Sequence, residues 1–234
     1  MAGERREAGH ENYLRCSGAA VAQVPGEQAT MSSALCVHIV DDDGAVCEAL
    51  GELLRSVGYQ VALYRSASEF LDVELPNAPA CLVVDVRLPR TSGLELQGYL
   101  TRLSISVPVI LMTGFGDIPM SVKGMKAGAV DFLTKPVREQ DLLDAVGAAI
   151  RGDQDRRQEA AKIAEWQERY ALLTPRERQV TALVASGLIN KQVANELAIA
   201  EVTVKMHRSS AMRKLRVKSP AKLGQIATAL SIIA

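Results

Sequence analysis

One stretch of the chain, residues 80–93, constrains its fold more than any other. It reads ACLVVDVRLPRTSG, an unbroken apolar run that leads into Asp85 and is followed by Pro89. Such a run is typical of a strand covered on both faces, as in a parallel α/β sheet, and the proline prevents the strand from continuing. Asp85 then lies at the carboxyl end of the strand, where open α/β sheets bind ligands. The alternative is an aspartate that only caps the following turn.

The segments around this stretch alternate between two patterns. Short apolar runs are separated by segments with apolar residues at helical spacing. Five strands alternating with five helices predict a doubly wound parallel sheet with helices on both faces, an α/β domain of (βα)5 type over residues 34–150. The expected strands are 35–40, 60–64, 81–85, 107–113 and 129–134, and the expected helices are 44–57, 66–74, 94–103, 118–127 and 138–150.

Polar residues follow the predicted strands at the same edge of the sheet. Asp41, Asp42 and Asp43 come directly after the first strand, Thr113 ends the fourth, and Lys135 follows the fifth. Crowded carboxylates repel one another and stay ionised only with a cation among them, and oxygen ligands of this kind suit Mg²⁺. An acidic triplet alone is more often a solvated loop. The convergence of four strand ends favours a site instead.

The charge of the chain is divided unevenly. It holds 27 basic and 27 acidic residues, but residues 174–234 hold 10 basic against 3 acidic, and residues 1–173 hold 17 against 24. A basic C-terminal unit on an acidic body predicts that this unit meets a polyanion. The alternative is a basic surface without a partner.

Composition also indicates a compartment. No apolar run is long enough to span a bilayer, and no signal peptide is visible, so we expect no membrane association. The cysteines at positions 16, 36, 47 and 81 lack metal-ligand spacing and are interpreted as small hydrophobic residues in a reducing compartment. We expect a cytoplasmic protein.

Two further segments flank or follow the α/β domain. Residues 1–33 are polar and aperiodic and are expected to be poorly ordered, with Met31 as a possible true start of translation. Residues 151–172 are charged, and Ile163, Trp166 and Tyr170 lie at helical spacing, which predicts a helical linker. We expect its narrow apolar seam to pack on its own domain rather than on a second copy.

Residues 173–234 form the last predicted unit. Thr174, Pro175 and Glu177 have the pattern of a helix start with a capping box. Helices over 175–186, 190–198, 201–215 and 219–231 follow with very short turns. Tight helix-to-helix turns are what a helix-turn-helix reader requires, so we predict an all-α four-helix domain that binds nucleic acid.

Residues 35–150 resemble the receiver domains of two-component response regulators. The matching motifs are VDDD (40–43), VVDVRLPRTSGLEL (83–96), MTGFGD (112–117) and MKAGAVDFLTKP (125–136). The resemblance implies that Asp85 accepts a phosphoryl group from a sensor histidine kinase and that Lys135 pairs with the phosphoryl oxygens. It also implies Mg²⁺ bound by Asp41, Asp42, Asp85 and the backbone carbonyl of Arg87, a switch made by Thr113 and Phe132, and a cis Lys135–Pro136 peptide.

Residues 173–215 resemble the LuxR-type helix-turn-helix of the FixJ/NarL response regulators, and the HRxxxMxKL spacing at 207–215 is closer to FixJ. The resemblance makes 201–215 the recognition helix and 190–198 its supporting helix. Ala200 replaces a frequent serine cap, and Ser209 replaces a lysine of some relatives. We expect DNA contacts from Lys191, Thr203, Lys205, Met206, His207, Arg208, Ser209 and Arg213.

These interpretations predict a response regulator rather than an enzyme. Phosphorylation of Asp85 is expected to promote a homodimer that binds double-stranded DNA with two-fold symmetry. A first alternative is a regulator whose receiver senses a ligand or partner without phosphorylation, and a second is an interaction protein without a role in nucleic-acid binding. A phosphatase of the haloacid-dehalogenase type would need a second aspartate two residues after Asp85, where Arg87 stands.

Overall fold

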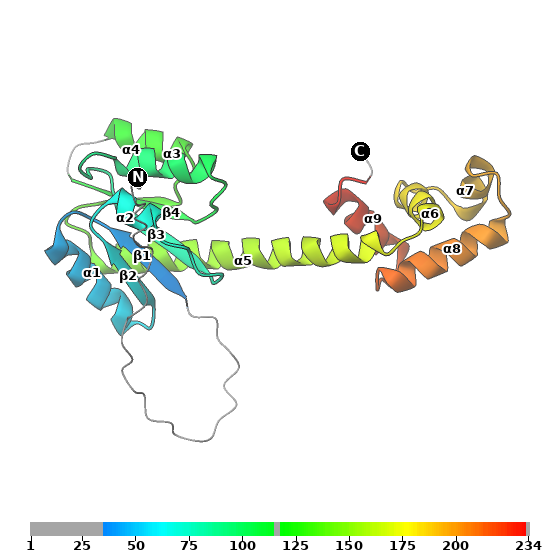
Figure 1. Cartoon of the computed structure of the whole chain (residues 1–234), viewed down its shortest axis with the longest axis horizontal. Coiled ribbons are helices and arrows are strands. Elements are labelled where there is room, and N and C mark those ends of the chain that lie inside the picture. The colour runs from blue at the N-terminus through cyan, green and yellow to red at the C-terminus, as the bar shows by residue number, and fades with distance from the viewer. Residues whose placement is uncertain (1–34, 115–117, 233–234) are drawn as a thin grey trace, which may run out of the picture. The chain divides into compact units, whose positions relative to one another are not determined.

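The N-terminal half of the protein is built on one parallel sheet. The computed structural model describes residues 35–114 and 118–232, so the expected N-terminal extension over 1–33, with Met31, lies outside the described residues. The sheet has the strand order β2-β1-β3-β4-β5, and all four strand pairs are parallel, as the alternating pattern predicts (Figure 1). The strands are β1 (Cys36–Val40), β2 (Gln60–Tyr64), β3 (Ala80–Asp85), β4 (Val109–Thr113) and β5 (Asp131–Thr134).

Helices cover both faces of the sheet. They are α1 (Gly44–Ser56), α2 (Ala67–Leu71), α3 (Gly93–Arg102), α4 (Ile118–Lys126) and α5 (Glu139–Ala171). Cys81 and Val83 of β3 pack in the core beneath α1 and α5, whereas Leu82 and Val84 pack in the core beneath α2 and α3. Every side chain of β3 up to Asp85 therefore faces an apolar layer, which explains the unbroken apolar run.

Capping fixes where the helices at the acidic edge begin. The carboxylate of Asp43 accepts the backbone N–H of Ala45 at 2.9 Å and caps α1. Ser92 and Glu95 form a capping box at the start of α3. The Asp43 carboxylate is therefore used to cap α1. Asp41 and Asp42 are the two residues of the acidic triplet that are left to form a site.

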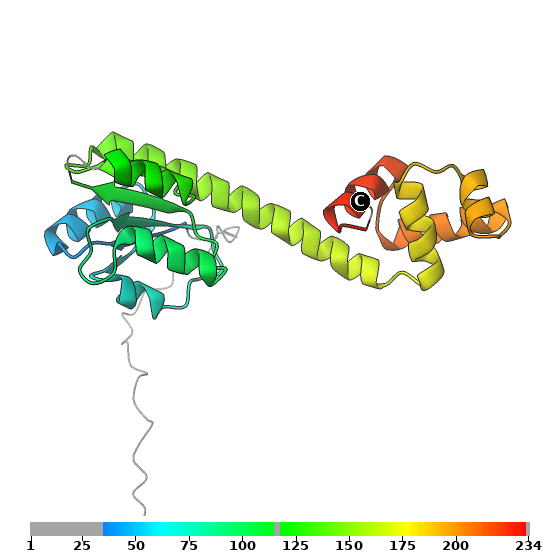
Figure 2. The same cartoon turned by 90° about the horizontal axis from the view of Figure 1, so that it is seen from above.

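The fifth helix differs from its sequence-based expectation. The sequence predicts a helix over 138–150 and a separate helical linker over 151–172, but α5 runs without a break for 33 residues from Glu139 to Ala171 (Figures 1 and 2). The charged composition of residues 151–172 predicts a linker of its own, but that composition marks a change of surroundings and not a break, and the helix continues through it.

The C-terminal domain is all α. Its helices are α6 (Pro175–Ala185), α7 (Asn190–Glu196), α8 (Glu201–Lys214) and α9 (Pro220–Ala229). Thr174 and Glu177 form the predicted capping box at α6. Tyr170 and Leu173 pack against the core of this domain. Part of the apolar seam predicted for the linker therefore contacts the C-terminal domain. No helix in the described part of the chain is long and apolar enough to cross a bilayer.

Candidate functional site

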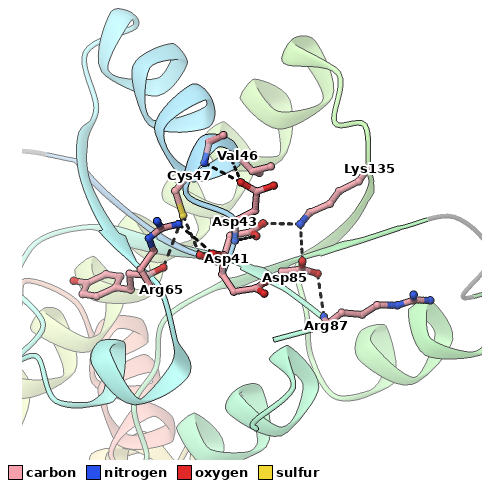
Figure 3. A network of polar contacts seen from close by, with 11 residues as sticks. Asp41, Asp43, Val46, Cys47, Arg65, Asp85, Arg87 and Lys135 are labelled. Carbon is pink, nitrogen blue, oxygen red and sulfur yellow. Dashed lines mark hydrogen bonds and ion pairs between the residues drawn. The ribbon is translucent and has the colours of Figure 1, made fainter. Parts of the chain in front are cut away.

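Three strand ends bring the predicted acidic residues and lysine together. Asp41 follows β1, Asp85 ends β3, and Lys135 follows β5. The Lys135 ammonium donates to Asp41 Oδ2 at 2.6 Å and to Asp85 Oδ2 at 2.5 Å, so one cation bridges two carboxylates that are 44 positions apart in the sequence (Figure 3). The Lys135–Pro136 peptide is cis, as the resemblance implies.

Three carboxylates at this edge have the geometry of a metal site. One oxygen each of Asp41, Asp42 and Asp85 lies within 4.8 Å of the others, with Asp41 and Asp85 buried and Asp42 exposed. The set carries three negative charges against one ammonium group. Hard carboxylate oxygens with an excess of negative charge fit Mg²⁺.

The ionisation of the cluster follows from burial and pairing. Burial raises the pKa of Asp41 above its usual range, by more than the hydrogen bond from Lys135 lowers it. Partial burial lowers the pKa of Lys135, but the hydrogen bonds to Asp41 and Asp85, together with the negative charges of these two residues, outweigh it and raise that pKa. The Lys135 ammonium therefore stays charged. Its single positive charge is shared between two carboxylates and cannot neutralise both of them.

The remaining predicted residues of this edge lie on or directly after β3, β4 and β5. The backbone N–H of Arg87 donates to Asp85 Oδ1 at 3.0 Å, so the Arg87 peptide lies beside the carboxylate. Thr113 ends β4 with 1% of its surface exposed, and its buried hydroxyl has no hydrogen-bond partner among the described residues. Phe132 of β5 is half-buried against the core beneath α2 and α3. An unpaired buried hydroxyl beside the site is available to an incoming oxygen acceptor.

Sequence reasoning missed one residue at this edge. Arg65 follows β2, and its Nη1 donates to the backbone carbonyl of Asp42 at 3.1 Å, across the start of α1 (Figure 3). Cys47 Sγ donates to the carbonyl of Asp41 at 3.3 Å. The signal for Arg65 was its place directly after a strand, because the carboxyl ends of parallel strands share one edge.

A second candidate surface lies on α8. Val202 and Met206 are apolar and yet 64% and 67% exposed. Lys205 forms an ion pair with Glu201 at 3.2 Å. Among the predicted DNA contacts, four line one shallow groove together with Val202 and Ser210: Lys205, Met206, Ser209 and Arg213.

The other four predicted DNA contacts lie outside this groove. Arg208 Nη1 donates to Asn190 Oδ1 at 2.9 Å and so ties α8 to the first residue of α7. Thr203 and His207 are half-buried, and Lys191 is exposed on α7. The sequence did not predict this hydrogen bond between Arg208 and Asn190.

The comparisons with protein families match both halves of the chain. Residues 37–147 match the model of the response regulator receiver domain, and residues 171–230 match the model of bacterial regulatory proteins of the luxR family. The two matches fall on the sheet domain and on the all-α domain. They contain the acidic edge and α8, respectively.

Individual proteins are similar over most of the chain. Nodulation protein W of Bradyrhizobium diazoefficiens is 47% identical over 89% of this chain and 92% of its own length. Transcriptional regulatory protein FixJ of Azorhizobium caulinodans is 42% identical over 84% and 93%. The solved structure of the response regulator StyR is 46% identical, has a TM-score of 0.73, and covers 83% of this chain and 98% of that one.

Proposed function

Because the chain belongs to the FixJ-type response regulators of two-component systems, which join a receiver to a LuxR-type DNA-binding domain, we propose that phosphorylation of Asp85 controls its binding to DNA. FixJ of Azorhizobium caulinodans is named a transcriptional regulatory protein and StyR a response regulator, so these relatives are regulators and not enzymes. The observation that carries the proposal is the bridge from Lys135 to Asp41 and Asp85, which leaves the acidic edge short of positive charge.

Each residue at the edge has a proposed part in phosphoryl transfer from a sensor histidine kinase. A carboxylate oxygen of Asp85 attacks the phosphorus atom in line with the leaving histidine nitrogen. Lys135 is positioned to pair with the phosphoryl oxygens. Mg²⁺, held by Asp41, Asp42, Asp85 and the carbonyl of Arg87, would neutralise the charge that develops on them.

The buried hydroxyl of Thr113 supports a switch at the same site. A phosphoryl group on Asp85 offers an acceptor to this unpaired donor, and Phe132 moves with it. The proposed consequence is a changed surface over α4, β5 and α5 that promotes a homodimer. A dimer suits a two-fold related operator with paired half-sites.

The exposed face of α8 is the proposed reader of the major groove. Lys205, Ser209 and Arg213 offer polar contacts, and the remaining basic residues bind phosphates, which position the domain without specifying a sequence. Val202 and Met206 present apolar surface that suits the methyl groups of thymine. We propose that the protein works in the bacterial cytoplasm, where its kinase and double-stranded DNA are both accessible.

Fluorescence anisotropy tests this function on the full chain. The probe is a duplex selected from a random library with protein treated with acetyl phosphate and Mg²⁺. We expect the treatment to tighten binding by roughly 5- to 150-fold for the wild type and not for Asp85→Asn. Asp72→Asn, an exposed acid on α2's C-terminal side, is the matched control and should respond like the wild type.

Two outcomes would contradict the proposal. A response that survives in Asp85→Asn would favour a regulator that senses a ligand or partner without phosphorylation. Affinity that is indifferent to salt between about 50 and 200 mM would contradict binding through phosphates.

A further inference from the structure

A buried carboxylate on α5 lies outside the phosphorylation machinery. Asp153 is 1% exposed, and its oxygens accept the backbone N–H of Ala80 at 3.1 Å, Arg157 Nε at 2.6 Å and Arg156 Nε at 3.1 Å. A buried carboxylate with three donors is satisfied and stays ionised. We call Asp153, Arg156 and Arg157 the Asp153 cluster.

The cluster fastens α5 to the loops that lead into the neighbouring strands β3 and β4. Arg156 Nη2 donates to the carbonyl of Ser106 at 2.7 Å, just before β4. Arg157 Nη1 donates to Asn77 Oδ1 at 2.9 Å, just before β3, and Ala80 is the first residue of β3. These are the strands whose other ends carry Asp85 and Thr113.

The helix needs such support at this point. Gly152 lies inside α5, and glycine and aspartate are poor helix formers. A Cβ on Gly152 would meet nothing within 4 Å, so no packing requires the glycine or holds it in place. Beyond the cluster, residues 158–162 are all exposed and gain no support from a core.

We propose that Asp153 is a positioning residue that keeps the linker helical across Gly152 and thereby transmits the phosphorylation-dependent change of the receiver to the DNA-binding domain. This proposal rests on the proposed function. The helix that packs on β3, β4 and β5 is the one that ends at Ala171, beside the core that contains Tyr170 and Leu173. A change in the receiver that shifts α5 reaches that core only if the helix does not bend at Gly152.

The test compares phosphorylation with its effect on DNA affinity. Asp153→Asn in the full chain should take up one phosphoryl group from acetyl phosphate and Mg²⁺ as the wild type does. The gain in DNA affinity on phosphorylation should fall from roughly 5- to 150-fold to less than about twofold. Amide hydrogen exchange over 150–158 should become faster in this variant.

A rescue variant separates transmission from general damage. Gly152→Ala has room for its Cβ and strengthens the helix without restoring the carboxylate. We expect the double variant Gly152→Ala/Asp153→Asn to recover most of the phosphorylation-dependent gain. Glu159→Gln, which removes an exposed acid paired with Lys162 on the same helix, is the control and should keep the full gain.

Three results would overturn the inference. The first is an Asp153→Asn chain that keeps the full gain in DNA affinity. The second is an Asp153→Asn chain that binds DNA tightly before phosphorylation, because the Asp153 cluster would then inhibit DNA binding. The third is a double variant without any recovery. A wild-type chain that binds DNA equally with and without the phosphoryl group would instead contradict the proposed function.

Discussion

The two ends of β3 carry two buried carboxylate clusters with opposite charge balance. At the carboxyl end, Asp85 shares the ammonium of Lys135 with Asp41, while Asp42 lies nearby. At the amino end, the single carboxylate of Asp153 faces two guanidinium groups and a backbone N–H. The first cluster has too little positive charge, and the second has more than enough.

The difference shows how burial can serve either function or structure. Burial raises the pKa of both Asp41 and Asp153, but hydrogen bonds from Arg157 and Arg156 outweigh it only at Asp153, whose pKa is lowered. A buried carboxylate whose positive partners all come from within the protein holds the fold. One that is left with an excess of negative charge has room for a cation from outside, which we propose to be Mg²⁺ at the acidic edge.

The largest expected effect is on stability, at the Asp153 cluster. Asp153→Ala leaves two arginines and the N–H of Ala80 without their acceptor and should lower the free energy of unfolding of the receiver by about 2–3 kcal/mol. The partial exposure of the arginines keeps the loss at this level. Differential scanning calorimetry measures it. A loss no greater than that of Glu159→Gln would contradict the comparison.

A fourth buried carboxylate, Glu177, extends the comparison to the C-terminal domain. Glu177 is paired with Lys214 at 2.7 Å, and this hydrogen bond, against the smaller effect of burial, lowers its pKa to about 2. Because the folded pKa is depressed, its stabilisation is present above about pH 4.5 and is lost as the pH falls towards 2. The loss is on the order of 2 kcal/mol.

Acid unfolding of the C-terminal domain, followed by circular dichroism, checks this pH dependence. Glu177→Gln should remove the stabilisation at neutral pH and flatten the acid transition between pH 4.5 and 2. An unchanged transition in this variant would show that Glu177 and Lys214 do not form a structural pair.

Magnesium should have a smaller effect on the stability of the receiver, and this effect should depend on the carboxyl end of β3 and not on its amino end. At a concentration ten times its dissociation constant, Mg²⁺ should stabilise the receiver by about 1.4 kcal/mol, because it binds only the folded acidic edge. Asp42→Asn should reduce this shift, whereas Asp153→Asn should keep it. Thermal unfolding at increasing Mg²⁺ measures both. A shift that disappears with Asp153 and not with Asp42 would reverse the assignment.

The smallest expected effect on stability is that of adding one exposed hydrogen bond at the start of α8. Ala200 is the N-cap of α8 and has no side chain to cap it. Ala200→Ser should raise the free energy of unfolding of the C-terminal domain by about 1 kcal/mol. Urea unfolding measures the gain. The absence of any gain would mean that the backbone at this turn does not accept the serine as a cap.

The sequence predicted the acidic edge because residues at the carboxyl ends of parallel strands can lie at only one edge of the sheet. Asp41, Asp85, Thr113 and Lys135 each follow a buried apolar run, and parallel strands bring such positions to one edge. No comparable pattern pointed to Asp153, because its partners near 77–80 and 106 are brought to it only by the packing of α5 against the sheet. The DNA-contacting face of α8 stays a prediction, because exposed side chains are not constrained by a core.

The central claim is that Asp85 is the residue that is phosphorylated at an edge completed by magnesium. Intact mass measurement after incubation with acetyl phosphate and Mg²⁺ tests it most directly. We predict an increase by the mass of one phosphoryl group in the wild type, lost when Mg²⁺ is chelated and absent from Asp85→Asn. An equal increase in Asp85→Asn, or no increase in the wild type, would contradict the account.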